Sequence, residues 1–144
     1  MRVNLEVFKK LPLGGTDRRS IVSGLAAHGP LAARELLAAQ LGRVCPRGAV
    51  LPNDTAVIVL GGSNGITRAV AIELLFGARA AVFGVHYDSD KMQIGVHHVA
   101  ALCQRAASDG LTARFWNNDA TKPSVADDVI AEIKHRYRVV HLIN

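Results

Sequence analysis

Residues 56–66 read AVIVLGGSNGI and decide the fold of the chain. The first five are all apolar and do not alternate with polar residues, which is typical of a strand buried on both faces of a parallel sheet. A glycine-rich turn follows at residues 61–65. Residues 66–76 are then predicted to form a helix that ends at Gly77. This stretch therefore predicts a strand, a tight turn and a helix in direct succession.

Three more strands follow, and helices separate them. Apolar stretches at 80–85, 111–116 and 139–143 predict the strands. Helices are predicted over 95–109, with Val96, Val99, Ala100 and Cys103 on the inner face, and over 125–136, with Ser124 as its cap. This alternation indicates right-handed crossovers between parallel strands. We expect an α/β fold, a Rossmann-like parallel sheet of about four strands in the order 3-2-1-4.

An N-terminal strand and helices are predicted before this sheet. Val3, Leu5 and Val7 alternate with polar residues, as in a short strand. A helix is expected over 18–27 and should end at His28-Gly29-Pro30, because glycine suits a helix C-terminus and proline cannot continue a helix. A second helix is predicted over 31–41, and residues 43–54 are expected to form a connector.

The composition is that of an ordinary globular protein. The 144 residues carry 17 Lys and Arg against 12 Asp and Glu, a formal charge of +5, and 49% of them are hydrophobic. The basic residues are scattered and have no aromatic residues between them, so we expect no nucleic-acid partner. The longest apolar run is far shorter than the roughly 20 residues of a membrane-spanning helix.

The cysteines and histidines predict no metal site and no disulfide framework. Cys45 and Cys103 lie 58 positions apart, and we expect two reduced thiols in a cytoplasmic protein. His97 and His98 are adjacent, so they point to different sides of a helix and do not form a chelating pair.

The glycine turn has the context of a dinucleotide-binding site, since it joins a buried strand to a helix. Gly61 permits the tight turn, and Gly65 allows a pyrophosphate to approach the backbone where the helix dipole favours anions. Thr67 occupies the place of the usual third glycine, which puts the tightness of the helix–strand contact in doubt. The predicted cofactor-binding residues of the turn are Gly61, Gly62, Ser63, Asn64, Gly65 and Ile66.

Two carboxylates follow the next two strands. Asp88, 23 positions beyond Gly65, is expected to accept hydrogen bonds from the adenosine ribose and to repel a 2′-phosphate, which favours NADH over NADPH. Lys91 softens this preference. Asp119 is expected to bind the adenine amino group, with Ala120 beside the ring.

Each signal also has a purely structural interpretation. The glycines can form a simple turn, Asp88 can begin a solvated loop, and Asp119 can start a helix before Thr121. Together, however, the three signals lie at the carboxyl ends of three successive parallel strands and outline one crevice. This convergence favours dinucleotide binding. The domains expected are 1–54, the N-terminal strand, helices and connector, and 55–144, the dinucleotide-binding half.

These residues resemble the short-chain dehydrogenase/reductase superfamily, and most closely its FabV-type trans-2-enoyl-CoA and enoyl-acyl-carrier-protein reductases. The turn at 61–66, Tyr87-Asp88 and Asp119-Ala120 stand at the positions of motifs of that family. So do Pro12-Leu13-Gly14 and His28-Gly29-Pro30-Leu31, which precede the first strand of the sheet. Departures from the family pattern are Leu11, Ile66, Thr67 and a longer stretch between residues 32 and 53.

The resemblance implies an NADH-binding portion of an enoyl-thioester reductase of fatty-acid metabolism, with an acyl-CoA or acyl-carrier-protein substrate. It covers only about the first third of such an enzyme. The family's catalytic tyrosine, and the lysine eight residues beyond it, have no counterpart here, so no catalytic residue is predicted. We expect an incomplete domain whose fourth strand is an apolar open edge suited to self-association. The alternatives are a non-catalytic dinucleotide-binding or dimerising module and a fragment of an ordinary short-chain dehydrogenase/reductase.

Overall fold

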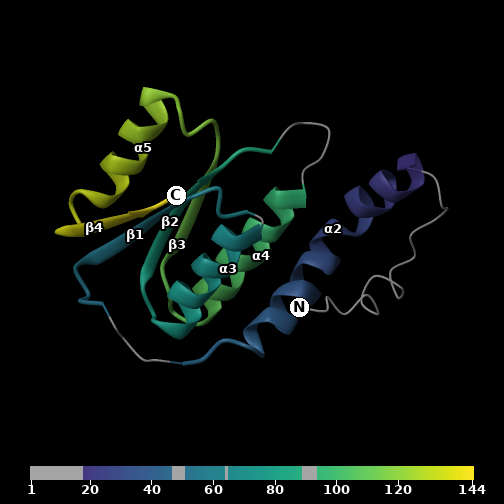
Figure 1. Cartoon of the computed structure of the whole chain (residues 1–144), viewed down its shortest axis with the longest axis horizontal. Helices are drawn as coiled ribbons and strands as arrows, with labels where there is room; N and C mark the ends of the chain where they lie inside the picture. The colour runs from purple at the N-terminus through teal and green to yellow at the C-terminus, as the bar shows by residue number, and fades with distance from the viewer. Residues whose placement is uncertain (1–17, 47–50, 64, 89–93) are drawn as a thin grey trace.

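The computed structural model describes residues 18–46, 51–63, 65–88 and 94–144 (Figure 1). The predicted strand at residues 3–7, the segment Leu11–Gly14, Asn64 and Lys91 lie outside these ranges. The elements are α2 (Arg18–Leu41), β1 (Thr55–Leu60), α3 (Gly65–Ile72), a π-helical turn η1 (Glu73–Gly77), β2 (Ala81–His86), α4 (Ile94–Ser108), β3 (Ala113–Asn117), α5 (Pro123–Ile133) and β4 (Val139–Ile143).

The four strands form one parallel sheet in the order β3-β2-β1-β4. β1 is central, and its Val57 lies opposite Val82 of β2 and His141 of β4. Ala56, Val57 and Val59 are all buried, as the unbroken apolar run predicts. The α/β class, the parallel pairing and the strand order are therefore confirmed.

Helices cover both faces of the sheet (Figure 1). On one face Val57, Val59 and Val82 pack with Leu75 and with Leu102 of α4. On the other face the sheet packs against α5. The buried residues of this second core are Ala56, Phe83 and Val85 of the central strands and Val125, Val129 and Ile133 of α5. This three-layer arrangement leaves the carboxyl ends of the strands at one edge of the molecule.

The N-terminal region forms one helix where two were predicted. α2 runs from Arg18 to Leu41 with Pro30 inside it. Gly29 is buried against α4, and a Cβ there would lie 2.3 Å from Cδ2 of His97. The glycine therefore permits close helix contact instead of ending the helix, and the burial of Ala33 and Leu37 offsets the hydrogen bond that proline removes.

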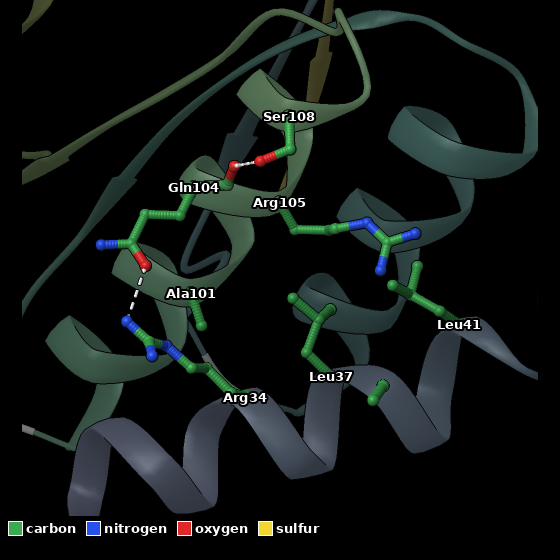
Figure 2. Close-up of a pocket in the computed structure, with 8 residues that line it drawn as sticks. Arg34, Leu37, Leu41, Ala101, Gln104, Arg105 and Ser108 are labelled. Carbon is green, nitrogen blue, oxygen red and sulfur yellow. Dashed lines mark hydrogen bonds between the residues drawn. The ribbon is translucent and has the colours of Figure 1, made fainter.

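Figure 2 shows the contact between α2 and α4, where the two helices enclose a cavity of about 240 Å³. Leu37 and Leu41 of α2 line it together with Ala101 of α4. At its rim, Nη2 of Arg34 donates a hydrogen bond to Oε1 of Gln104 at 3.3 Å. These contacts fix α2 along the outer side of α4.

We expect Pro30→Ala to raise the free energy of unfolding by about 2 kcal/mol. Proline inside a helix destabilises the folded state by about 3 kcal/mol. Proline also lowers the conformational entropy of the unfolded chain, which offsets up to about 1 kcal/mol of that loss. Urea unfolding measures the change, with the exposed Pro46→Ala as the matched control. A loss of stability in Pro30→Ala contradicts the continuous helix, because proline is favourable at the first position of a separate helix.

Two further helix predictions were wrong in detail. The buried face of α4 is Gly95, Val99, Ala101, Leu102 and Ala106, whereas Ala100 is exposed. Because α4 packs against α2 as well as against the sheet, a different set of its residues is buried from the set predicted for contact with the sheet alone. α5 begins at Pro123 after Lys122, and Ser124 does not cap it. Proline is well suited to the first position because its φ is preset and it has no N–H to satisfy.

β4 forms an edge of the described sheet, and Val139, Val140 and Leu142 are exposed there. Within the described ranges, no helix combines the length and apolar character needed to cross a bilayer. In the same part of the chain, no three His, Cys, Asp or Glu side chains gather into a possible metal site.

Candidate functional site

An open groove of about 510 Å³ lies where β1, β2 and β3 end. It contains four of the predicted site residues, and His86 and Lys122 are among those that sequence reasoning missed. The lining residues are Gly61, Val85, His86, Tyr87, Asn118, Asp119, Ala120 and Lys122. The parallel order of the strands brings together residues that are up to 61 positions apart in the chain, as the switch-point rule expects.

Gly61 and Gly65 occupy left-handed backbone conformations, with φ of +77° and +61°. A Cβ at Gly65 would meet nothing within 4 Å, so the space beside the start of α3 is open. Thr67 does not loosen the turn, since its Oγ1 donates a hydrogen bond to the Gly61 carbonyl oxygen at 2.7 Å. The hydroxyl thus ties the helix to the turn where the usual pattern has glycine.

Gly62 has a packing role that the sequence did not reveal. A Cβ there would lie 2.7 Å from the ring of Phe115, and a Cβ at Gly84 would lie 2.1 Å from the same ring. The phenyl ring of β3 therefore lies against two glycines and supports the turn from behind. Ser63 is buried, whereas the side chain of Ile66 is exposed.

Asp88 is anchored to the start of α4. Its Oδ2 accepts a hydrogen bond from the backbone N–H of Val96 at 2.7 Å, where the helix dipole favours a negative charge. Its own N–H donates to Oδ1 of Asn117 at 2.9 Å. Gly95 makes this possible, because a Cβ there would lie 2.6 Å from both carboxylate oxygens. One carboxylate oxygen is thus committed to the helix, and Asp88 is not among the lining residues of the groove.

Asp119 organises the loop that follows β3. Its Oδ1 accepts hydrogen bonds from the hydroxyl and the backbone N–H of Thr121, at 2.7 and 2.9 Å. These two bonds, the hydroxyl first, lower the pKa of Asp119 below its usual value. Asn118 joins the strand ends, because its N–H donates to the His86 carbonyl oxygen at 2.8 Å. Asp119 therefore serves a local turn and also faces the groove.

Buried polar side chains lie near the turn, and the sequence gave no sign of them. Arg68 and His86 are each only 4% exposed. Burial lowers the pKa of His98 to about 4, the charge of Arg68 adds to the effect, and Nδ1 of His98 lies 3.3 Å from the Ser63 carbonyl oxygen. Burial also lowers the pKa of His86. Both imidazoles are thus neutral at neutral pH.

We expect the chain to lose stability as the pH falls from about 6.5 to 4. In this window the unfolded state binds a proton at His98 and the folded state does not, so the free energy of unfolding decreases as the pH falls. Below about 4 both states are protonated. Melting temperatures between pH 7 and 4.5 measure the effect. His98→Gln should show a shallower decline than the wild type, and His141→Gln, at an exposed site on β4, should not. Equal declines in all three proteins contradict the assignment.

No family model matches the chain. Several curated proteins, however, are similar to the chain in sequence. The chain is 32% identical over 109 residues to an enoyl-acyl-carrier-protein reductase [NADH] of Burkholderia thailandensis, and 29% identical to the protein of the same name in Variovorax paradoxus. The chain is related to the N-terminal part of these reductases. Each alignment includes 72% of this chain and only 27–28% of the relative, so the chain spans less than a third of the length of these enoyl reductases.

Solved structures of enoyl reductases share the fold. The trans-2-enoyl-CoA reductase of Clostridium acetobutulicum, in complex with NAD, superposes with a TM-score of 0.62 at 25% identity, covering 75% of this chain and 29% of that one. The Treponema denticola trans-2-enoyl-CoA reductase, also with NAD, gives a TM-score of 0.56 at 27% identity, covering 78% and 30%. The sequence-based resemblance to enoyl reductases is thus confirmed over this part of their length.

Proposed function

We propose that the chain is the NADH-binding portion of an enoyl-thioester reductase, which reduces a trans-2-enoyl-CoA or an enoyl-acyl-carrier protein in fatty-acid metabolism. The observation that carries the proposal is the groove in which Gly61, Tyr87, Asp119 and Ala120 lie together. Such a crevice, beside a glycine turn at a helix N-terminus, is suited to a dinucleotide. The relatedness to NADH-dependent enoyl reductases supports the choice of cofactor and reaction.

In this proposal each part of the site serves one part of NADH. The open backbone at Gly65 receives the pyrophosphate, and Asp88 accepts from the adenosine ribose through its second carboxylate oxygen. The adenine lies in the groove beside Asp119 and Ala120. Gly62 supports the turn by leaving room for the ring of Phe115, and Ser63 supports it as a buried residue. Asn64 and Ile66 are the other residues of the turn in this proposal. Residues 55–144 form the dinucleotide-binding half, and residues 1–54 form the N-terminal extension.

The reaction itself requires residues that this chain does not offer. Tyr87 lines the groove at the strand ends, and Tyr137 packs edge-on against Phe83. We therefore assign no catalytic residue here. The enoyl-thioester substrate is part of the same proposal. So is a cytoplasmic location, which we expect because the two cysteines are unpaired.

Fluorescence tests the cofactor proposal. Trp116 is the only tryptophan of the chain and lies in β3. Only β2 separates β3 from β1, the strand that leads into the glycine turn. Excitation of Trp116 should give saturable energy transfer to added NADH and a weaker signal with NADPH. Asp88→Asn should narrow the difference between the two cofactors, because it removes the charge that repels a 2′-phosphate. Equal affinity of the wild type for both cofactors would argue against the ribose role of Asp88.

A second candidate is a self-associating module without catalysis, and the exposed edge at β4 favours it. Val139, Val140 and Leu142 present apolar side chains along an edge strand, which is a template for pairing with another chain. Sedimentation velocity should then show a dimer that Val140→Lys converts to a monomer. A monomer at all concentrations in the wild type removes this candidate.

A further inference from the structure

Arg68 buries a positive charge in α3, three residues after the last glycine of the turn. It is the fourth residue of α3, and its side chain is 4% exposed. Within the described ranges, its Nε and Nη2 atoms have no hydrogen-bond partner. Burying two N–H-bearing atoms of a charged guanidinium without partners is costly, since several kcal/mol of hydration are lost per buried ion. The position therefore calls for a compensating group.

The neighbours of Arg68 place its charge close to the turn. The charge of Arg68 acts on His98, and Nδ1 of His98 lies 3.3 Å from the carbonyl oxygen of Ser63, a residue of the turn. The same part of the structure includes the start of α3, where a Cβ at Gly65 would meet nothing within 4 Å. The guanidinium and the helix N-terminus thus act on the same region.

No carboxylate of the described residues neutralises Arg68. Burial alone lowers its pKa, to about 10, so the side chain stays protonated at neutral pH. Asp88, the acidic residue that acts on His98, is hydrogen-bonded to the N–H of Val96 at the start of α4. His98 itself is neutral, as its lowered pKa shows. An unbalanced positive charge therefore lies close to the turn, and it favours the binding of an anion there.

We propose that Arg68 is a nucleotide-binding residue whose buried charge holds a phosphate group of the bound nucleotide at the glycine turn. This inference rests on the proposed function and adds a residue to it. The phosphate is the 5′-diphosphate, which would lie at the start of α3. NADH has no 2′-phosphate, so adenosine 2′-monophosphate serves as the comparison ligand.

Calorimetric titrations with adenosine, ADP and adenosine 2′-monophosphate test the proposal in the wild type, Arg68→Met and Arg68→Lys. Arg34→Met, on α2 and away from the groove, is the control. We expect Arg68→Met to bind ADP about tenfold more weakly or worse, as for the loss of a charge-assisted contact. Affinity for adenosine should not change, and Arg68→Lys should recover part of the loss.

The outcomes separate this inference from the proposed function. A loss with ADP and not with adenosine supports the contact with the diphosphate, whereas a loss confined to adenosine 2′-monophosphate overturns it and contradicts the choice of NADH. Unchanged affinity for both in Arg68→Met, or an equal loss that includes adenosine, overturns the role of Arg68 while the proposed function stands. A wild type that binds none of the three ligands overturns both. If Arg68→Met does not fold, Arg68→Lys decides the comparison, because lysine keeps the charge but changes the geometry of the donors. Unchanged affinity for all ligands then overturns the contact, and a change in affinity for ADP alone supports it.

Discussion

Leu102→Ala is expected to lower the free energy of unfolding by about 2–5 kcal/mol, the range for truncating a large side chain in a packed core. Leu102 is fully buried on α4 and packs in the core that also includes Val57, Leu75 and Leu37 of α2. Its side chain thus joins the sheet, η1, α4 and the N-terminal helix. Removing it leaves a cavity that these four elements cannot close by small shifts.

Urea unfolding followed by circular dichroism measures this change. The matched control is Leu142→Ala, the same substitution at an edge position that is 65% exposed, where we expect a change within about 0.5 kcal/mol. Similar losses in the two variants would mean that the core is not where the structure places it.

Gly84→Val is expected to cost about 3 kcal/mol, at the upper end for overpacking a core. A Cβ at this position would lie 2.1 Å from the ring of Phe115, and the ring cannot move toward Gly62, where a Cβ would lie 2.7 Å from it. Valine is a better strand former than glycine, so intrinsic propensity predicts the opposite sign. The expected loss is therefore specific to the contact with the ring.

A double-mutant cycle isolates this contact. Phe115→Leu in the Gly84→Val background should recover at least about 0.5 kcal/mol relative to the sum of the single changes, because the two residues are in contact. NADH affinity should also fall in Gly84→Val, since displacement of Phe115 disturbs the turn. Strict additivity of the two substitutions would show that Phe115 does not occupy the space over Gly84.

The local sequence predicted those parts of the fold that depend on local patterns. The run at Ala56–Leu60, the glycines after it and the repeated strand–helix alternation were sufficient for β1, α3 and the strand order. Asp119 and Tyr87 were placed correctly at strand ends, because parallel strands share the edge at which they end. The roles of the site residues in binding NADH stay predictions.

Long-range contacts account for the errors. Gly29 and Pro30 are local stop signals, but burial against His97 and α4 outweighs them and α2 continues. The role of Gly62 depends on a ring 53 positions away in the chain. The buried environment of Arg68 depends likewise on tertiary packing, which no spacing in the sequence reveals. In α5, the lysine–proline start at residues 122–123 replaced the expected serine cap.

The central claim is that the groove at the ends of β1, β2 and β3 binds a dinucleotide. Isothermal titration calorimetry of the folded chain with NADH tests it most directly, at two temperatures so that a vanishing enthalpy at one of them is not misread as no binding. The account predicts saturable binding at one site per chain, with competition by ADP. The absence of heat at both temperatures, from protein shown to be folded by circular dichroism, would contradict it.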